Sequence, residues 1–497
     1  MSLFRTKSIE ESLAASHEEG HSLRRRLSAL DLTVFGIGVI IGAGIFTVTG
    51  RAAKDYAGPS IVLSFVLGAV ACALAALCYA EFASTVPVSG SAYTFSYATL
   101  GEIVAWIIGW DLLLELMLGA SVVAQGWSQY LITFLTQVGV TWPASVGPGS
   151  HFDLAAFLLV GALAALVAKG IKESLRVNLA LVALKLLIVL FVIFAGISFV
   201  NTANWSPFIP PSAPGGATAS GLTTPLLQVL TGMTPATYGV MGIMAGASIV
   251  FFAYIGFDVV ATTAEEANNP QRDLPIGIIA SLAICTVLYV AVALVLTGMQ
   301  KYSDIDSKAA LATAFTHVGR DGFATLISAG AVAGLTTVVM TLLIGAVRVV
   351  FAMSRDRLLP ERLSRTSERT GTPISLTLII GTTVALIASL TPIGKLEEMV
   401  NIGTLTAFML VSLAVPMLRR SRPDLHRSFR VPGSPVVPIL SALVCFYLVL
   451  NLSIETWIRF IVWMALGFVV YFAYSRHHSR LAGRDEVRQP ALDVKGP

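Results

Sequence analysis

Apolar residues form long runs along this chain, and short polar segments separate them. A helix of about 20 apolar residues is long enough to cross a bilayer. Twelve such runs are present, with boundaries good to a few residues. They cover roughly residues 29–49, 59–83, 101–133, 152–169, 176–199, 239–262, 276–299, 322–353, 374–391, 397–418, 434–452 and 455–474. The pattern predicts an all-α polytopic membrane protein with twelve transmembrane helices.

Glycine interrupts the first of these spans. The stretch GIGVIIGAGIF, residues 36–46, holds four glycines at a depth where a helix should be regular. Each glycine weakens a helix interior by roughly 0.5–1 kcal/mol relative to alanine. Irregular backbone is tolerated at membrane depth where it lines a cavity inside the protein. The alternative is that the glycines only allow close packing of two helices.

A second interruption lies in the sixth span. In FFAYIGFD, residues 251–258, a glycine stands between aromatic residues and is followed by an acid. Interrupted spans at corresponding positions in two halves of a chain indicate the binding site of a transporter. The two ends of a broken helix offer free amides and free carbonyls, which suit the carboxylate and the ammonium group of a zwitterion.

The positions of the two breaks also predict an internal repeat. Spans 1–5 and 6–10 form two five-helix halves of opposite orientation, each beginning with a broken helix. We therefore divide the chain into a cytoplasmic tail (1–27), a first repeat (28–200), an external loop (201–238), a second repeat (239–418), helices 11 and 12 (419–474) and a second cytoplasmic tail (475–497).

Composition and charge agree with a membrane protein. Hydrophobic residues make up 55% of the chain and charged residues 12%, about half of the charged fraction usual in soluble domains. Most of the Lys and Arg residues lie in the tails and in alternate loops, whereas the loop 201–238 contains none. By the positive-inside rule this predicts that both termini are cytoplasmic. The amino-terminal segment has no cleavable apolar region, so it is not a signal peptide.

Several segments resemble a known family. They are the two glycine-interrupted stretches, PVSGSAYTFSYATLGEIVAWIIGWDLLLE from residue 87, and VRVVFAMSRDRLLP at the end of span 8. In this order they are similar to the amino acid–polyamine–organocation (APC) superfamily, and within it to the cationic amino acid transporter (CAT) family. The resemblance implies a LeuT-type fold with 5+5 inverted repeats, broken helices 1 and 6, and secondary active transport of an amino acid.

The resemblance also implies a substrate site on the two breaks. The substrate amine would meet the carbonyls of Ile40, Phe252, Ala253 and Ile255, and the carboxylate would meet the amides of Gly42, Ala43 and Gly44. Many family members carry Thr or Ser where this chain has Ala43. The amide is kept here, but a hydroxyl contact to the carboxylate is lost.

One lysine lies deep inside a span. Lys185 is about 13 Å from the cytoplasmic end of span 5, too deep for its ammonium group to reach the interface. An ionisable residue at this depth is by default a functional hypothesis. Proton-driven relatives have a lysine in this span, so we expect Lys185 to couple transport to protons. The alternative is a permanently charged lysine that only binds carbonyls of span 1.

Four further side chains are candidates for the cavity or its gates: Glu115, Tyr254, Asp258 and Met340. Glu115 lies one helical turn from Asp111 and would face the bundle interior. Asp258 follows the second break, where the alternative role is a helix cap. Tyr254 is either a gate or ordinary packing. Span 8 has Met340 and neighbouring threonines where it would face the site, and no acid. This favours a small or medium neutral amino acid as the substrate, unless Glu115 or Asp258 supplies a negative charge.

Other classes of protein find little support. The histidines lie in tails and loops, the four cysteines lie in apolar spans, and no metal spacing, nucleophile elbow or phosphate loop is present. We expect neither an enzyme nor a channel, and no cofactor, metal or nucleic-acid partner. The expected partners are an amino acid, protons and membrane lipid.

The sequence thus predicts proton-coupled uptake of L-amino acids by alternating access. The alternatives are transport of cationic amino acids or polyamines, or amino acid exchange. Residues 435–474 form a candidate surface for a homodimer, and a small accessory membrane peptide is a further possible partner. The high arginine content relative to lysine and the lack of an organelle signal favour a bacterial plasma (inner) membrane.

Overall fold

The fold is known from a computed structural model. It describes residues 27–85, 91–170, 175–214, 221–232, 236–367 and 371–481. Most of the expected amino-terminal tail and the end of the carboxyl-terminal tail therefore lie outside the described residues. Eight helices in the described part are long and apolar enough to cross a membrane, and four shorter helices are also apolar. This confirms an all-helical membrane protein.

Each predicted span coincides with helical residues. The first span is divided into α2 (Ala29–Ile40), a π-helical turn (Gly44–Val48) and α3 (Thr49–Ala52). The sixth is divided into α10 (Gly239–Val250) and two 3₁₀ segments (Phe251–Tyr254 and Asp258–Glu266). The other ten spans contain α4 (Ile61–Thr85), α6 (Glu102–Gln137), α7 (Leu154–Ala168), α8 (Leu175–Ile197), α11 (Pro270–Met299), α13 (Asp321–Arg355), α14 (Ile374–Leu390), α15 (Ile393–Ser421), α16 (Val436–Leu450) and α17 (Ile454–Val470).

Connecting segments carry further structure that the hydrophobic pattern did not predict. Short helices α5 (Ser91–Thr99), α9 (Leu226–Thr231) and α12 (Ala310–His317) lie between the long ones. In the predicted external loop, β1 (Ala213–Pro214) pairs with β2 (Ala236–Thr237) in antiparallel register. Beyond α17, the chain continues through a π-helical turn (Tyr471–Ser475) into α18 (Arg476–His478).

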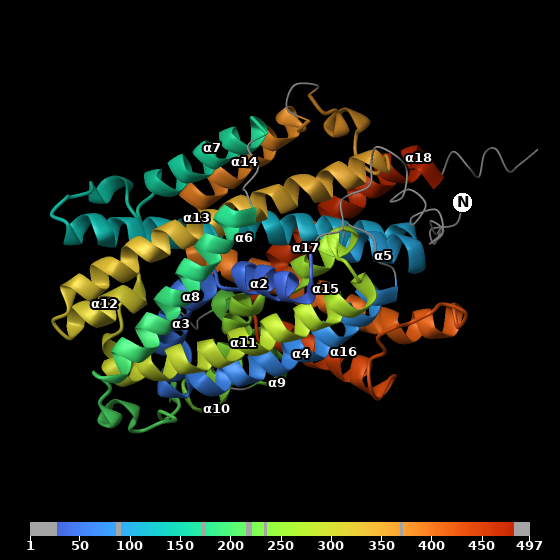
Figure 1. Ribbon diagram of the computed structural model, residues 1–497. Helices are drawn as coiled ribbons and strands as arrows, with labels where there is room; N and C mark the ends of the chain where they lie inside the picture. Colours follow the sequence, from blue (N-terminus) through green and yellow to red (C-terminus); the bar gives the residue numbers. More distant parts are fainter. Residues whose placement is uncertain are drawn as a thin grey trace, which may run out of the picture.

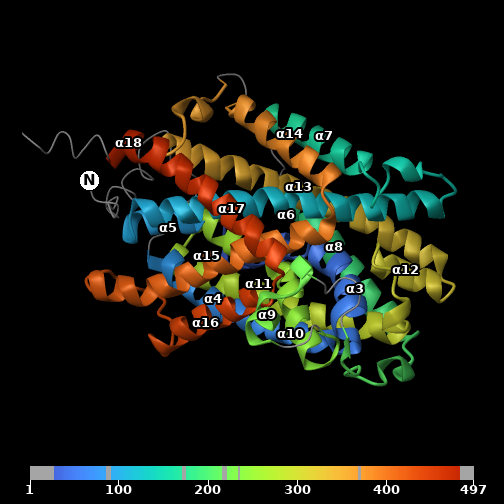
Figure 2. The same cartoon turned by 180° about the vertical axis from the view of Figure 1, so that it is seen from behind.

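The long helices pack side by side in one bundle. α7 and α14 pair along one edge, and α4 and α11 pair along the opposite edge, with α6 and α13 packed along each other between them (Figure 1). Seen from behind, α17 crosses the outer side of α6 (Figure 2). One end of the bundle carries α5 and α18, and the other carries α12 (Figure 1).

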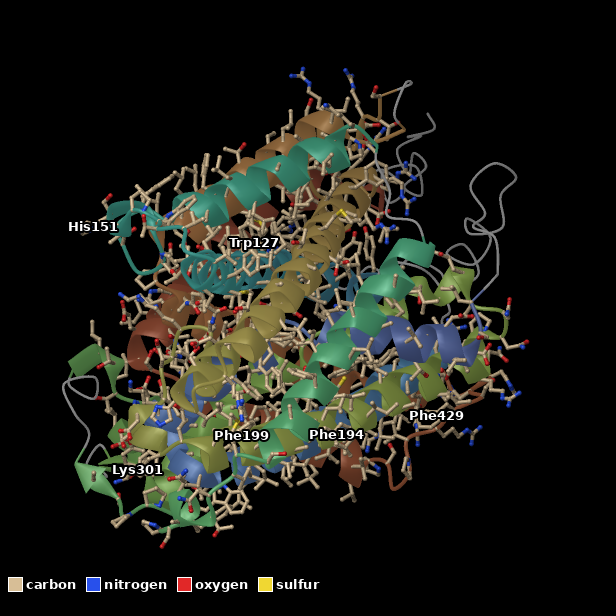
Figure 3. All side chains as sticks on the ribbon, turned by 60° about the vertical axis from the view of Figure 1, so that its left-hand side comes forward. Trp127, His151, Phe194, Phe199, Lys301 and Phe429 are labelled. Atoms are coloured by element: carbon tan, nitrogen blue, oxygen red, sulfur yellow. The ribbon has the colours of Figure 1, made fainter. Side chains whose placement is uncertain are left out.

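The outer surface of the bundle is apolar, as lipid contact requires. Phe194 on α8 is 70% exposed and projects outward (Figure 3). Exposed leucine, isoleucine and valine side chains are also found on α7, α11, α14, α16 and α17. The polar groups that bear on function are therefore found inside the bundle.

Candidate functional site

The first helix break follows directly from the glycine-rich stretch. α2 ends at Ile40, and Ile41 leaves the helical conformation with a φ of −72° and a ψ of 85°. The backbone becomes helical again at the π-helical turn that begins at Gly44. The first N–H groups of a helix have no carbonyl of an earlier turn to bind. The break therefore puts backbone donors at Ala43 and Gly44 inside the bundle.

The second break depends on one glycine. After the 3₁₀ turn Phe251–Tyr254, Ile255 is extended, with a ψ of 136°. Gly256 then has a φ of +120°, a conformation that residues with a Cβ rarely adopt. The chain turns helical again at Asp258. The backbone around Ile255 is thus outside the regular helical pattern at the middle of the span.

The two breaks lie against each other, and glycine makes this approach possible. A Cβ on Gly44 would overlap the Cα of Ala253, and a Cβ on Gly256 would come within 2.7 Å of Val39 Cγ1. A glycine of each break thus packs against a residue of the other span. The backbones of the two breaks are therefore in close contact at these two glycines.

A small cavity of about 30 Å³ lies at these breaks. Its lining residues are Val39, Ile40, Gly42, Ala43, Gly44, Glu115, Gly119, Val123, Phe252, Ile255, Val338 and Leu342. Six of the seven predicted substrate-binding residues are among them, and Ala253 lies just behind, against Gly44. A cavity of this size holds about two water molecules, so an amino acid enters only if the surrounding helices move.

Residues of α6 and α13 complete the cavity, and sequence reasoning found only one of them. Gly119 and Val123 follow Glu115 at intervals of four, so the three share one face of α6. Val338 and Leu342 do the same on α13. The spacing of four from Glu115 is the signal that would have identified Gly119 and Val123. The predicted Met340 is half-buried and is not part of the lining.

The carbonyl of Ile40 already has two hydrogen-bond donors. The amide of Gly42 donates to it over 2.8 Å, and the hydroxyl of Tyr289 on α11 donates over 2.7 Å. A carbonyl oxygen has two lone pairs, so both are used. A substrate amine that binds Ile40, as the sequence predicts, must displace one of these donors. Tyr289 is a site residue that the sequence analysis missed.

Lys185 joins three helices next to the first break. Its side chain is 1% exposed, and its ammonium group donates a hydrogen bond to the carbonyl of Gly38, two residues before the end of α2. A Cβ on Gly334 of α13 would overlap the aliphatic part of the Lys185 side chain, so the lysine can pass α13 only because residue 334 is a glycine. The lysine thus lies where sequence reasoning expected it, in contact with span 1.

Buried acids lie beside the cavity. Asp111 and Asp258 are the charged neighbours of Glu115, and all three are at most 2% exposed. Within the described residues, both Asp111 oxygens, Glu115 Oε2 and Asp258 Oδ1 have no hydrogen-bond partner. Asp258 is the first residue of the second 3₁₀ segment, and no side-chain capping hydrogen bond is found there in the described part of the chain, so the helix-cap alternative stays a prediction. Glu115 is the one acid among the described residues that line the cavity.

Tyr254 occupies a packing position instead of the cavity wall. Its hydroxyl donates to the carbonyl of Phe65 on α4 over 2.9 Å, and its ring contacts the rings of Phe65 and Tyr289. It is completely buried and is not part of the cavity lining. Its contacts fix the second break against α4.

The bundle of apolar helices and the paired breaks define a multi-pass membrane protein with a small cavity between the two breaks. Residues 27–471 match the amino acid permease family. The chain is 47% identical over 491 residues to the branched-chain amino acid permease BcaP of Bacillus subtilis (strain 168), which covers 97% of this chain and 99% of that protein. It is 45% identical over 486 residues to the methylthioribose transporter of the same organism, with 97% and 99% covered.

A more distant similarity extends to plants. The chain is 36% identical over 428 residues to the vacuolar cationic amino acid transporter 4 of Arabidopsis thaliana, covering 85% of this chain and 68% of that protein. The protein belongs to the amino acid permease family, within the APC superfamily, as its motifs indicated. It is therefore a transporter and not an enzyme, and its family implies a LeuT-like fold.

Proposed function

We propose that this permease takes up neutral L-amino acids together with protons by alternating access. The observation that carries the proposal is the wall of the central cavity. Its side chains are aliphatic or aromatic except for Glu115. They surround the backbone of the two breaks, which can bind a zwitterion once Tyr289 or Gly42 gives up its hydrogen bond to the Ile40 carbonyl. Val123, Val338 and Leu342 offer an apolar surface to an aliphatic side chain.

Alternating access requires the two breaks to open in turn. We assign the chain twelve transmembrane helices, with residues 28–200 and 239–418 as inverted repeats and both termini on the cytoplasmic side of the plasma membrane. The contacts of Gly44 with Ala253 and of Gly256 with Val39 support the inverted repeats, which require the two breaks to lie together. A homodimer through residues 435–474 and an accessory peptide stay predictions.

The proposed substrate class rests on the cavity and on the relatives together. BcaP is described as a permease of branched-chain amino acids, which agrees with an aliphatic wall. One observation favours cationic amino acids or polyamines instead, since Glu115 Oε2 is buried at the cavity without a partner among the described residues. Methylthioribose is a further competitor to test, given the second Bacillus relative.

Lys185 is the proposed proton-coupling group. Its charged hydrogen bond holds the end of α2 at Gly38. Loss of the proton would remove the charge from this bond and weaken it, since charge-assisted hydrogen bonds are about twice as strong as neutral ones. The movement of α2 that opens the cavity would then depend on the protonation of Lys185.

The test is uptake by purified protein in liposomes with an inward proton gradient, imposed or collapsed. Labelled leucine is the substrate, and unlabelled alanine, leucine, arginine and methylthioribose compete. Lys185→Met keeps the stem beside Gly334 but removes the charge and the donor. Lys395→Met, which breaks a surface ion pair of 3.0 Å with Glu455, is the matched control.

We expect the proton gradient to drive accumulation of leucine in the wild type. In Lys185→Met we expect no gradient-driven accumulation, but only exchange of labelled for unlabelled leucine. The control variant should behave as the wild type. Unchanged gradient-driven accumulation in Lys185→Met would overturn the role of the lysine. If arginine competes more strongly than leucine or alanine, the neutral substrate class is overturned. If the wild type exchanges leucine at the same rate with and without the gradient and never accumulates it, the protein is an amino acid exchanger.

A further inference from the structure

α6 contains three glycines in its interior: Gly109, Gly119 and Gly126. Glycine destabilises the interior of a helix relative to alanine, so each of them needs a reason. Two of them allow another residue to pack closely. A Cβ on Gly109 would come within 2.9 Å of Met353 Sδ, and a Cβ on Gly126 would come within 3.0 Å of Thr47 Cγ2. Close packing therefore explains Gly109 and Gly126.

Neither packing nor backbone conformation explains Gly119. Apart from α6 itself, a Cβ there would have one atom of the described residues within 4 Å, Leu342 Cδ1 at 3.6 Å, which is an ordinary van der Waals contact. α6 is helical along its whole length, so the backbone at Gly119 has a conformation that any residue adopts. Gly119 is nevertheless buried and lines the central cavity. The missing side chain leaves space in the wall of this cavity.

This space belongs to the part of the wall that the helix breaks do not form. Residues of the two breaks line one part of the central cavity, and Glu115, Gly119 and Val123 of α6 with Val338 and Leu342 of α13 line the rest. Gly119 is one turn of α6, about 6 Å, from Glu115 and from Val123. A zwitterion whose charged groups bind the backbone of the breaks has its side chain against this second part of the wall.

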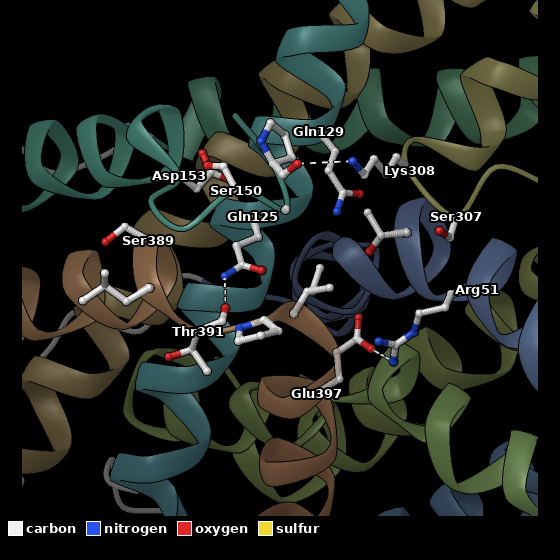
Figure 4. A pocket seen from close by; sticks show the side chains of 16 residues that line it. Arg51, Gln125, Gln129, Ser150, Asp153, Ser307, Lys308, Ser389, Thr391 and Glu397 are labelled. Carbon is white, nitrogen blue, oxygen red and sulfur yellow. Dashed lines mark hydrogen bonds and ion pairs between the residues drawn. The ribbon is translucent and has the colours of Figure 1, made fainter. Parts of the chain in front are cut away.

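The larger cavity of the structure, of about 230 Å³, has a different wall (Figure 4). Charged side chains from several elements line it, namely Arg51, Asp153, Lys308 and Glu397. An aliphatic side chain gains free energy when it leaves water for an apolar surface, and the α6 and α13 part of the central cavity offers that surface apart from Glu115. Selection among aliphatic side chains therefore belongs to the central cavity.

We propose that Gly119 is a specificity-determining residue that sets the largest side chain the permease accepts. When the helices move to admit a substrate, the end of its side chain occupies the space that Gly119 leaves, and Leu342 forms the facing wall. The ligand class is a neutral amino acid with a branched aliphatic side chain, such as leucine. One methylene group more or less in an apolar pocket changes selectivity by about 10- to 200-fold. This inference rests on the proposed function and deepens it.

Gly119→Ala tests the proposal, because it adds one methyl group at this space and favours the helix. Purified variants in liposomes take up labelled leucine and, separately, labelled alanine under the inward proton gradient, and kcat/KM is measured for each. Gly161→Ala on α7 is the matched control. Gly161 is exposed, and a Cβ there has none of the described residues within 4 Å, so the same change is made outside the cavity. A further variant combines Gly119→Ala with Leu342→Val, which shortens the facing side chain.

We expect Gly119→Ala to lower kcat/KM for leucine about tenfold, which corresponds to ~1.4 kcal/mol. The value for alanine should stay close to that of the wild type, because its side chain does not reach the space. Adding Leu342→Val should restore most of the transport of leucine. Gly161→Ala should transport both amino acids as the wild type does. The melting temperature of Gly119→Ala in detergent should not fall, since the added Cβ overlaps no other atom.

The outcomes distinguish a size limit from a structural role. Equal loss of leucine and alanine transport in Gly119→Ala, or a lower melting temperature, would show a structural glycine and overturn the proposal. An unchanged ratio of the two kcat/KM values would overturn it as well. Absence of any recovery with Leu342→Val would overturn Leu342 as the facing wall. Failure of the proposed function shows separately, as absence of uptake of both amino acids by the wild type.

Discussion

Gly44 and Gly42 differ in the space that their surroundings leave for a side chain, although they are only two residues apart. A Cβ at Gly44 would overlap the backbone of Ala253, whereas a Cβ at Gly42 would lie 3.4 Å from the Val338 side chain. Overpacking costs about 1–3 kcal/mol, and backbone yields less than a side chain. We expect Gly44→Ala to lower the melting temperature and abolish uptake, and Gly42→Ala to stay folded and to exclude mainly the larger substrates. Thermal unfolding in detergent and liposome uptake check this, and equal behaviour of the two variants would contradict it.

Single residues also show what the sequence can and cannot reveal about the site. The glycines at 42, 44 and 256 were visible as defects in an apolar run, so the breaks were predicted. Lys185 was visible because a charge is rare at that depth. Tyr289 was not, because its role depends on where α11 brings its hydroxyl, at the Ile40 carbonyl. Val338 lies two residues from the predicted Met340, and only the rotation of α13 decides which of them faces the cavity.

Among the elements, α4 and α15 are joined at the end of the bundle opposite α12. Arg419 at the end of α15 donates two hydrogen bonds to the Glu81 carboxylate on α4, at 2.8 and 2.6 Å. The amide of Val431 donates to the same carboxylate over 2.7 Å, and the buried Arg427 lies 3.7 Å from it. One carboxylate thus holds two helices and the segment that leads to α16.

Removing this carboxylate should destabilise the protein. We expect Glu81→Gln to cost about 3 kcal/mol, because it leaves the buried Arg427 and the partly buried Arg419 without their anion. The melting temperature in detergent measures the loss. Asp424→Asn, which removes the partner of Arg422 at the surface, is the control and should leave the melting temperature unchanged. A shift no larger than that of the control would show that the contacts of the Glu81 carboxylate contribute little to stability.

The bounds of the elements were predicted less well than their existence. α11 begins at Pro270, six residues before the expected span, because proline is favoured in the first helical turn and the polar residues that follow lie outside the apolar run. The short helices α5 and α12 were missed because they are not long enough to form an apolar run, and they are held by contacts with α6 and α13. Tertiary contacts, and not local pattern, decide such elements.

The distribution of basic residues over the whole molecule predicts its orientation in the membrane. Basic side chains follow α13 and α15 at the end of the bundle that carries α5 and α18, whereas the loop 201–238 has none. The positive-inside rule places the first end in the cytoplasm. A membrane-impermeant maleimide should then label Ser303→Cys in right-side-out vesicles and Ser428→Cys only in inverted vesicles. The native cysteines are buried and give a low background.

This orientation also decides which side of the membrane the larger cavity faces. If Ser303 is external, the cavity of about 230 Å³ that Arg51, Lys308 and Glu397 line faces the outside. The Arg51–Glu397 pair then lies on the path of entry, and Glu81 must separate from Arg419 for release to the cytoplasm. Labelling in the reverse pattern would place this cavity on the cytoplasmic side and would contradict the proposed orientation. Labelling of both cysteines in each kind of vesicle would contradict a fixed orientation altogether.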